Sequence, residues 1–199
     1  MELTITTNTS ARRVYSEKLA NWLKPLRNKS IIEWTIEQLQ IQPYQHILEI
    51  GYTSGYTLNE TGRKLKIGFL AGIGDSMDRW LQAYRVNKKL IEEKLLQLHI
   101  GNLNELPYPH HYFHTIYSNN ISALQEDPAN IILQSYELLR SGGKLVTIYQ
   151  PSTKASEKEI NHYVEKLKQE FSDAGLLNIC TAYRDVYPTT CIAVTGYKE

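Results

Sequence analysis

The chain has 199 residues, of which 42% are hydrophobic and 22% charged, so it can build one sizeable core, and wholesale disorder is excluded. Lysine plus arginine number 22 and aspartate plus glutamate 21, and the net charge of +1 gives no overall field that would gather nucleic acid. Cys180 and Cys191 are too few for a disulfide scaffold, so we expect them reduced and half-buried.

The start of the chain and its apolar runs predict where the protein resides. Residues 1–10 contain no basic segment leading into an apolar one, and the longest apolar run, Ile67–Ile73, is far shorter than the roughly 20 residues of a membrane span. We therefore expect a soluble, cytoplasmic protein without a membrane span.

Four helices are predicted from an N-cap residue followed by apolar residues at helical spacing. They begin at Ser30, at Asp75 or Ser76, at Asp127 and at Ser156, and extend to about Gln40, Ile91, Arg140 and Ala174. Ser30 with Glu33 and Ser156 with Glu159 have the spacing of capping boxes. The second helix carries a stripe that includes Trp80 and Tyr84, which we expect to pack into the core.

Short apolar runs between these helices predict seven strands. They are His46–Ile50, Ile67–Ile73, Leu95–Ile100, Phe113–Ser118, Lys144–Tyr149, Leu177–Tyr183 and Thr190–Tyr197. The alternation of strands and helices predicts an α/β fold with a mostly parallel sheet covered on both faces. The loop Arg184–Thr189 contains Pro188 and predicts that the last two strands form an antiparallel hairpin. We expect one domain over residues 1–199, with residues 1–42 as an N-terminal helical cap.

The most informative segment is Ile47–Leu58, an apolar strand that runs into a glycine-containing turn and then into a helix. Such a turn lets the backbone approach a ligand, while the helix start offers unpaired N–H groups. The turn is neither a P-loop, which needs a Lys-Ser/Thr pair, nor G-x-G-x-x-G, because Thr53 stands at the second glycine. Taken alone, these residues fit a ligand site and a purely structural turn equally well.

Five segments, in this order, resemble motifs of the class I S-adenosylmethionine-dependent methyltransferases. They are Leu48-Glu49-Ile50-Gly51 with Gly55, Ala71–Ser76, Leu98–Pro109, Phe113–Asn120 and Leu138–Leu145. The small-molecule branch, which includes the ubiquinone and menaquinone biosynthesis methyltransferases, is the most similar. The resemblance covers most of the chain and implies a Rossmann-like three-layer sandwich with a seven-stranded sheet.

The resemblance also implies that the chain uses S-adenosylmethionine and releases S-adenosylhomocysteine. The cofactor-binding residues that it implies are Glu49, Gly51, Thr53, Gly55, Gly74, Asp75, Asn102, Leu103 and Asn119. In the family, the residue at Glu49 contacts the methionine portion, and that at Asn102 accepts a hydrogen bond from the adenine amine, with the N–H of Leu103 beside it. Asn119 falls in the segment beneath the sulfonium.

Two positions depart from the family pattern. Thr53 replaces the middle glycine of the turn, so that a branched side chain enters its narrowest part. Gly74 stands where an acidic residue normally accepts both ribose hydroxyls, and the loss of these charge-assisted bonds costs roughly 1.5 to 3 kcal/mol each. Asp75 follows directly and either replaces that carboxylate or caps the next helix.

Other clusters carry less information. No spacing singles out a catalytic base, and Tyr15, Tyr52 and His114 are only candidates. His110, His111 and His114 lack a neighbouring cysteine and helical i, i+4 spacing, so we expect no metal. Six basic residues against one acidic residue, Glu17, lie between positions 12 and 29, where they form either an anion-attracting surface or a solvated helix face. They are Arg12, Arg13, Lys18, Lys24, Arg27 and Lys29.

These observations lead to three hypotheses. The first is methyl transfer from S-adenosylmethionine to a small-molecule acceptor, mainly by holding acceptor and methyl group in line. The second, based on Thr53 and Gly74, is a catalytically silent member of the fold that binds a ligand or partner. The third, RNA methylation, rests on the basic N-terminal run but lacks an Asn-Pro-Pro-Tyr type of motif, so nucleic acid is not the expected partner.

Overall fold

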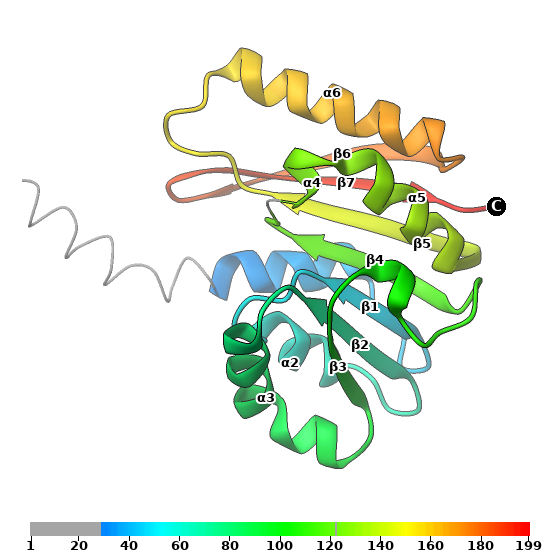
Figure 1. Ribbon diagram of the computed structural model, residues 1–199. Helices are drawn as coiled ribbons and strands as arrows, with labels where there is room; N and C mark the ends of the chain where they lie inside the picture. Colours follow the sequence, from blue (N-terminus) through cyan, green and yellow to red (C-terminus); the bar gives the residue numbers. More distant parts are fainter. Residues whose placement is uncertain (1–28, 122) are drawn as a thin grey trace, which may run out of the picture.

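The computed structural model describes residues 29–121 and 123–199 and shows a sheet flanked by helices (Figure 1). Its strands are β1 (His46–Ile50), β2 (Phe69–Gly74), β3 (Leu96–Ile100), β4 (Phe113–Asn119), β5 (Leu139–Tyr149), β6 (Leu177–Val186) and β7 (Thr189–Tyr197). Its labelled helices are α2 (Tyr56–Gly62), α3 (Met77–Glu92), α4 (Ala123–Glu126), α5 (Pro128–Leu138) and α6 (Glu157–Asp173), with a short 3₁₀ helix, η1 (Leu103–Glu105). A further helical segment covers 29–39.

The strand order is β3-β2-β1-β4-β5-β7-β6. Strands β1 to β5 pair in parallel, whereas β7 is antiparallel to both β5 and β6. This topology confirms the expected Rossmann-like α/β fold with an antiparallel C-terminal hairpin. The order reverses between β1 and β4, and open α/β sheets bind ligands at the carboxyl ends of the strands beside such a point.

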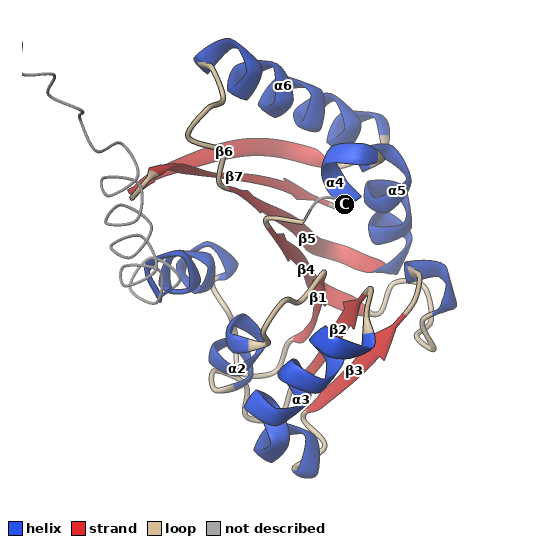
Figure 2. Cartoon of the chain, turned by 60° about the vertical axis from the view of Figure 1, so that its left-hand side comes forward, coloured by secondary structure: helices blue, strands red, loops and turns tan. Residues whose placement is uncertain are grey.

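The helices cover both faces of the sheet, so the molecule has three layers (Figure 2). One face packs against α5 and α6, with Ile132 and Phe171 fully buried. The other face packs against α2, α3 and the helix 29–39, and its buried side chains include Leu58 and Trp34. The parallel strands read as nearly continuous apolar runs because both of their faces are covered.

The helix 29–39 departs from its predicted start. Lys29 is already helical, so Ser30 lies inside the helix, and its prediction as the N-cap was wrong. Trp34 and Leu39 are buried against the sheet at 2% and 0% exposure. Most of the predicted cap 1–42, together with five of the six basic residues of the N-terminal run, lies outside the described residues.

The other predicted helix starts are confirmed in detail. Ser76 rather than Asp75 caps α3, because its Oγ accepts a hydrogen bond from the Arg79 N–H. Asp127 caps α5, and Ser156 with Glu159 forms the predicted capping box of α6. Such caps matter because the first N–H groups of a helix have no partner within it.

Several element ends differ from the sequence expectation. Ile67 is 82% exposed and precedes β2, so the second strand begins later than predicted. The hairpin loop is shorter than expected, because β6 continues to Val186 and pairs there with Thr189. Neither cysteine is half-buried, because Cys180 is exposed and Cys191 is buried.

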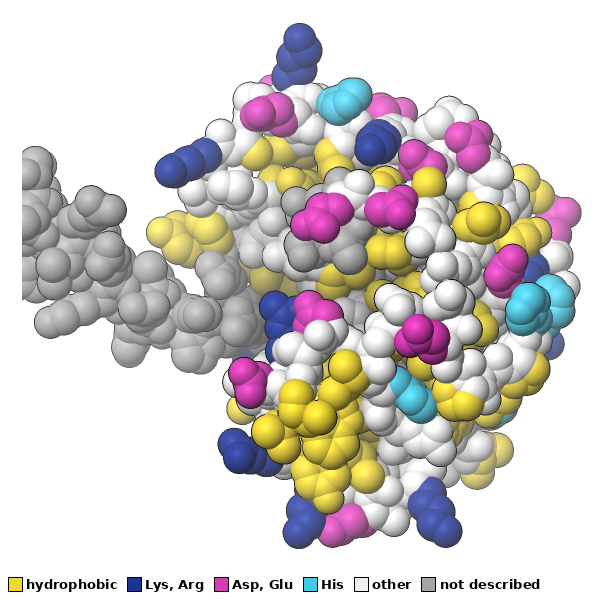
Figure 3. All heavy atoms as spheres, viewed as in Figure 1, with side chains coloured by type: hydrophobic (Ala, Val, Ile, Leu, Met, Phe, Trp, Pro, Cys, Tyr) yellow, Lys and Arg dark blue, Asp and Glu magenta, His cyan; other side chains and the backbone are white. Residues whose placement is uncertain are grey.

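Helix α3 packs Ala83, Leu90 and, in part, Trp80 against the core as predicted, and it also has an apolar outer surface. Trp80 and Tyr84 stack at a centroid distance of 5.2 Å but are only half-buried, and Met77 and Leu81 are exposed. Hydrophobic side chains accordingly gather over this helix in Figure 3. In the described part of the chain, no helix has the length and apolar character needed to cross a membrane.

Candidate functional site

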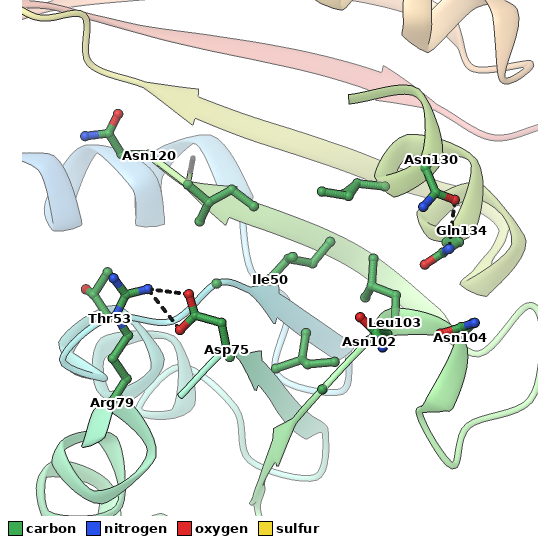
Figure 4. A pocket seen from close by; sticks show the side chains of 16 residues that line it. Ile50, Thr53, Asp75, Arg79, Asn102, Leu103, Asn104, Asn120, Asn130 and Gln134 are labelled. Atoms are coloured by element: carbon green, nitrogen blue, oxygen red, sulfur yellow. Dashed lines mark hydrogen bonds and ion pairs between the residues drawn. The ribbon is translucent and has the colours of Figure 1, made fainter. Parts of the chain in front are cut away.

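A cavity of about 610 Å³ lies at the carboxyl ends of β1, β2, β3 and β4 (Figure 4). It is lined by Ile50, Gly51, Thr53, Ile73, Gly74, Asp75, Arg79, Gly101, Asn102, Leu103, Asn104, Asn120, Ile121, Asn130, Ile131 and Gln134. Asp75, Arg79 and Thr53 lie at one end and Asn102, Asn104, Asn130 and Gln134 at the other, with Ile50 between them. The cavity thus offers an apolar middle and two polar ends, a composition typical of small-molecule sites.

The glycine turn after β1 forms one wall of this cavity. Gly51 has a φ of 74°, which L-residues rarely adopt, and a Cβ at this position would lie 2.2 Å from Cγ2 of Ile121. The loop after β4 therefore approaches the turn so closely that only glycine fits at position 51.

Gly55 serves a different purpose. It begins α2 with a φ of 80°, and a Cβ there would lie 2.7 Å from both Cα of Ala83 and Nδ2 of Asn87. Fully buried Asn87 donates from Nδ2 to the Gly55 carbonyl and to the Ala83 carbonyl, both at 2.9 Å. Asn87 also has a non-helical φ of −111°, so α3 bends at this contact. Gly55 is thus explained by helix packing, and it does not line the cavity.

Tyr52, within the turn, packs against Gly74 at the end of β2. Its ring is fully buried, and a Cβ on Gly74 would lie 2.8 Å from Cζ and 2.9 Å from Cε2 of that ring. Its hydroxyl donates to the His99 carbonyl on β3 at 2.7 Å. Tyr52 therefore fills the space that a side chain at position 74 would need.

Asp75 provides a carboxylate next to this position. Its side chain is 70% exposed and lines the cavity, and its two oxygens lie 3.1 and 3.0 Å from Nη1 of Arg79. Because Ser76 caps α3, the carboxylate of Asp75 is not needed as the N-cap.

At the opposite end, Asn102 precedes the helix η1. Its Nδ2 donates to Oε1 of Glu105 at 3.2 Å, and its backbone N–H donates to Oε2 at 3.3 Å. These bonds hold the amide at the cavity rim. Leu103, the next residue, lines the cavity with an almost fully buried side chain.

Glu49 lies away from the cavity lining. It is 3% exposed, and its Oε2 accepts a hydrogen bond of 2.8 Å from Tyr117, whose hydroxyl lies 3.1 Å from Oγ1 of Thr61 on α2. Burial raises the pKa of Glu49 to about 8, against the opposing effect of the Tyr117 hydrogen bond. Burial therefore favours the protonated, neutral form of this carboxyl.

Asn119 points to the N-terminal helix, because its Nδ2 donates to Oγ1 of Thr35 at 3.3 Å. The next residue, Asn120, has a φ of 57° and lines the cavity, and its Oδ1 accepts a hydrogen bond from the Gln150 N–H. The end of β4 thus presents Asn120 rather than Asn119 to the cavity.

Of the nine predicted cofactor residues, the structure brings six together around the cavity: Gly51, Thr53, Gly74, Asp75, Asn102 and Leu103. Glu49, Gly55 and Asn119 are outside the lining. The lining residues that sequence reasoning missed are Ile50, Ile73, Arg79, Gly101, Asn104, Asn120, Ile121, Asn130, Ile131 and Gln134. The i, i+4 spacing of Asn130 and Gln134 was a readable signal, since they form a hydrogen bond of 2.9 Å on one face of α5.

The candidate bases are not at the cavity. Burial, with the charges of Asp75 and Glu49, raises the pKa of Tyr52 to about 12, and its hydroxyl is already bonded to a carbonyl. His114 lies near the amino end of β4, where its Nδ1 accepts from the His46 N–H and Arg140 lies 2.9 Å from its Nε2. Neither Tyr52 nor His114 lines this cavity, and Tyr15 is outside the described residues.

The histidines predicted as a cluster near β4 have separate partners. His111 lies 3.0 Å from Nζ of Lys198, while His114 faces Arg140. Within residues 29–121 and 123–199, no group of three His, Cys, Asp or Glu side chains is arranged to hold a metal ion.

A sheet of this order, with a cavity between the glycine turn and the ends of β2, β3 and β4, defines the class I methyltransferase fold. A profile of the family described as "Methyltransferase domain" matches residues 48–147, about half of the chain. The chain belongs to this methyltransferase family. Its membership confirms the expected dependence on S-adenosylmethionine.

Individual relatives agree with this assignment. The uncharacterized methyltransferase YdaC of Bacillus subtilis is 27% identical over 183 residues, which are 90% of this chain and 98% of the relative. A SAM-dependent methyltransferase from Aquifex aeolicus superposes with a TM-score of 0.67 at 15% identity, over 83% of this chain and 88% of the other.

A third relative was solved with ligands. Geranyl diphosphate C-methyltransferase from Streptomyces coelicolor, in complex with Mg²⁺, geranyl diphosphate and S-adenosyl-L-homocysteine, gives a TM-score of 0.68 at 14% identity, over 86% of this chain and 79% of the other. At these identities the two structures show the fold alone. The similarity to the ubiquinone and menaquinone branch stays a prediction.

Proposed function

We propose that this enzyme transfers the methyl group of S-adenosylmethionine to a small-molecule acceptor at the cavity. The observation that supports this best is the convergence of six predicted cofactor residues, from the ends of β1, β2 and β3, on one cavity of about 610 Å³. Cavities that hold cofactors and small ligands have volumes of roughly 300 to 1,000 Å³.

The residues present fit the cofactor. The turn around Gly51 and Thr53 lines the place proposed for the amino-acid end, and the N–H of Gly51 itself donates to the Ile73 carbonyl at 2.8 Å. Ile73, Leu103 and Ile131 supply apolar contact for an adenine ring. An adenine amine can donate to the side-chain carbonyl of Asn102, whose Nδ2 is already bonded to Glu105.

The chemistry divides between cofactor and protein. When bound, S-adenosylmethionine supplies a methyl group activated by its sulfonium. The chain then has to hold and orient both reactants and exclude water, and such positioning contributes several kcal/mol to catalysis. No described side chain of the cavity needs to act as a nucleophile in this proposal.

The acceptor is proposed to lie beside the carboxyl ends of β4 and β5. Asn120 bonds to Gln150 there, and Thr35 of the N-terminal helix reaches Asn119. Arg184 of β6 forms an ion pair with Glu37, which holds the same helix over the sheet. We propose that residues 1–42 act as the cap over this acceptor region.

Binding of S-adenosylhomocysteine, measured by calorimetry and thermal shift, tests the cofactor part of the proposal. We expect binding with modest affinity and a melting temperature that rises with ligand concentration. No response up to millimolar ligand would contradict the assignment of this cavity to the cofactor.

Methyl transfer tests the acceptor part. The enzyme with methyl-labelled S-adenosylmethionine is incubated with a metabolite extract and, separately, with total RNA, and a heat-inactivated sample serves as the control. We expect label in the low-molecular-mass fraction. Label in RNA would contradict the small-molecule proposal, and cofactor binding without any transfer would favour the silent alternative.

A further inference from the structure

The outer face of α3 carries apolar side chains that the core does not use. Met77 and Leu81 are 60% and 39% exposed, and α3 is the one helix in the described part of the chain that exposes two large hydrophobic residues. Half-buried Trp80 and Tyr84 lie beside them, at the i, i+3 and i, i+4 spacings of neighbours on a helix surface. These four residues form one apolar patch, and exposed patches of this kind mark interaction sites.

The aromatic part of the apolar patch is held in place by the rest of the protein. The rings of Trp80 and Tyr84 stack at a centroid distance of 5.2 Å and an interplanar angle of 19°. Nε1 of Trp80 donates to the Leu98 carbonyl on β3 at 3.4 Å, so the single donor of the indole is already satisfied. Side chains that are fixed before binding lose little conformational entropy when a partner covers them. The patch is therefore preorganised for contact with another protein surface.

Two exposed charges of opposite sign lie along this patch. Asp78 and Arg85 are seven residues apart, which is about two helical turns, so they lie on the same side of α3. No ion pair among the described residues involves either of them, whereas Lys88 is paired with Glu92. The helix becomes non-helical at Asn87, so both charges belong to the straight part that carries the patch.

This face of α3 is complementary to itself under two-fold symmetry. Met77 and Asp78 lie four and three residues before Leu81, and Tyr84 and Arg85 lie three and four residues after it. When two α3 helices pack antiparallel about an axis at Leu81, the two leucines meet, and Asp78 of each copy lies beside Arg85 of the other. Each contact then occurs twice, as in every isologous interface, and the two helix dipoles are opposed.

We propose that a second copy of this chain covers the outer face of α3 in a two-fold symmetric dimer centred on Leu81. The inference is independent of the proposed methyl transfer, because none of the four patch residues lines the cavity. The patch and its two charges are fewer than the roughly 20 to 30 residues that each partner contributes to a standard interface. The dimer is therefore expected to exchange reversibly with the monomer.

Sedimentation of the full chain over a range of protein concentrations tests the dimer. We expect a shift from monomer to dimer as the concentration rises. Leu81→Arg should weaken the association at least about tenfold, because it brings two positive charges together at the symmetry axis. Leu133→Arg is the matched control, because Leu133 is a 51% exposed leucine on α5 that does not line the cavity. It should dimerise like the parent, and circular dichroism checks the folding of both variants.

Charge reversal tests the antiparallel arrangement. Asp78→Arg alone and Arg85→Asp alone should each weaken the dimer about tenfold, because like charges then face each other in both symmetric pairs. The double variant, Asp78→Arg with Arg85→Asp, restores opposite charges and should dimerise within about threefold of the parent.

Several results would overturn the inference. A parent chain that stays monomeric at its highest soluble concentration, or a dimer that Leu81→Arg leaves intact, would show that no second copy covers this face. A monomer that binds phosphatidylserine vesicles would assign the face to a membrane surface instead. Weakening by both single reversals without recovery in the double variant would contradict the antiparallel arrangement.

Discussion

At the scale of single residues, Gly51 and Gly142 form a natural pair. Both have a left-handed backbone, with φ of 74° and 73°, but a Cβ at Gly142 meets nothing within 4 Å, whereas one at Gly51 would collide with Ile121. We expect Gly142→Ala to lower the free energy of unfolding by about 1 kcal/mol, because only the backbone is strained. Gly51→Ala should lower the free energy of unfolding by about 1 to 3 kcal/mol more, because the added methyl group overpacks the contact with Ile121. This variant should also abolish binding of S-adenosylhomocysteine.

Urea denaturation and calorimetry of both variants measure these effects. Equal losses of stability, with binding intact in both, would show that the contact between Ile121 and the turn has no consequence for the site. The parallel variant Gly51→Val is expected to lose binding too.

Glu49 predicts a pH dependence of stability. Its pKa is about 8 in the folded protein, raised by burial from its ordinary value of 4.5. Between these pH values the folded chain keeps a proton that the unfolded chain has lost, so unfolding releases a proton. The contribution of Glu49 is therefore fully present below pH 4.5 and declines as pH rises to about 8.

We expect Glu49→Gln to remove this decline, which has a limiting slope of roughly 1.4 kcal/mol per pH unit. Denaturation of parent and variant from pH 5 to 9 gives the difference curve, in which contributions of other titrating groups cancel. A variant whose stability parallels that of the parent over the whole range would show that Glu49 is already ionised when folded.

At the scale of secondary structure, what could be predicted depended on local signals. The caps at Ser76, Asp127 and Ser156 were readable because each bond joins residues three apart in the sequence. The start of the helix 29–39 could not be predicted in this way, because a capping-box pattern such as that at Ser30 also fits the interior of a helix.

The candidate site likewise contains residues that could be predicted from the sequence and residues that could not. The six predicted residues that reach the cavity lie at or just after the ends of β1, β2 and β3, where motif order along the chain places them. The place of Tyr52 against Gly74 could not be predicted, because a ring can leave a turn in several directions and only packing against Leu58 and the sheet selects one. Glu49 likewise faces α2 because its partner Tyr117 comes from β4, 68 residues away.

Helix α3 carries the prediction that belongs to this scale. Asn87→Leu removes the bonds to the Gly55 and Ala83 carbonyls and leaves a buried carbonyl without that donor, at a cost of about 1 to 3 kcal/mol. Because Gly55 begins α2 after the glycine turn, affinity for S-adenosylhomocysteine should also fall.

Thermal melts and calorimetry of Asn87→Leu are compared with those of Lys88→Ala, an exposed neighbour on the same helix whose change should stay within about 0.5 kcal/mol. If the two variants have the same stability and affinity, the buried amide does not support the turn.

At the scale of the whole molecule, the last strand is an internal one. β7 lies between β5 and β6 and pairs with both, and Val194 and Ala193 at its centre are buried. A chain ending at Val186 should therefore fail to fold cooperatively, since β6 loses the strand that joins it to the sheet and β5 loses one of its two partners. A chain lacking only the exposed Glu199 should melt like the parent. Far-UV circular dichroism during heating distinguishes the two, and a cooperative melt of the shorter chain near the parent temperature would contradict this expectation.

The position of β7 also has a consequence for synthesis on the ribosome. In the described part of the chain, every residue that lines the cavity lies between positions 50 and 134, so this wall has been synthesised well before β7. The sheet that supports it cannot close until the final residues emerge, and until then β5 and β6 present unpaired edges to other chains. Aggregation during translation should therefore be most sensitive to the interval between the synthesis of β5 and the release of the finished chain.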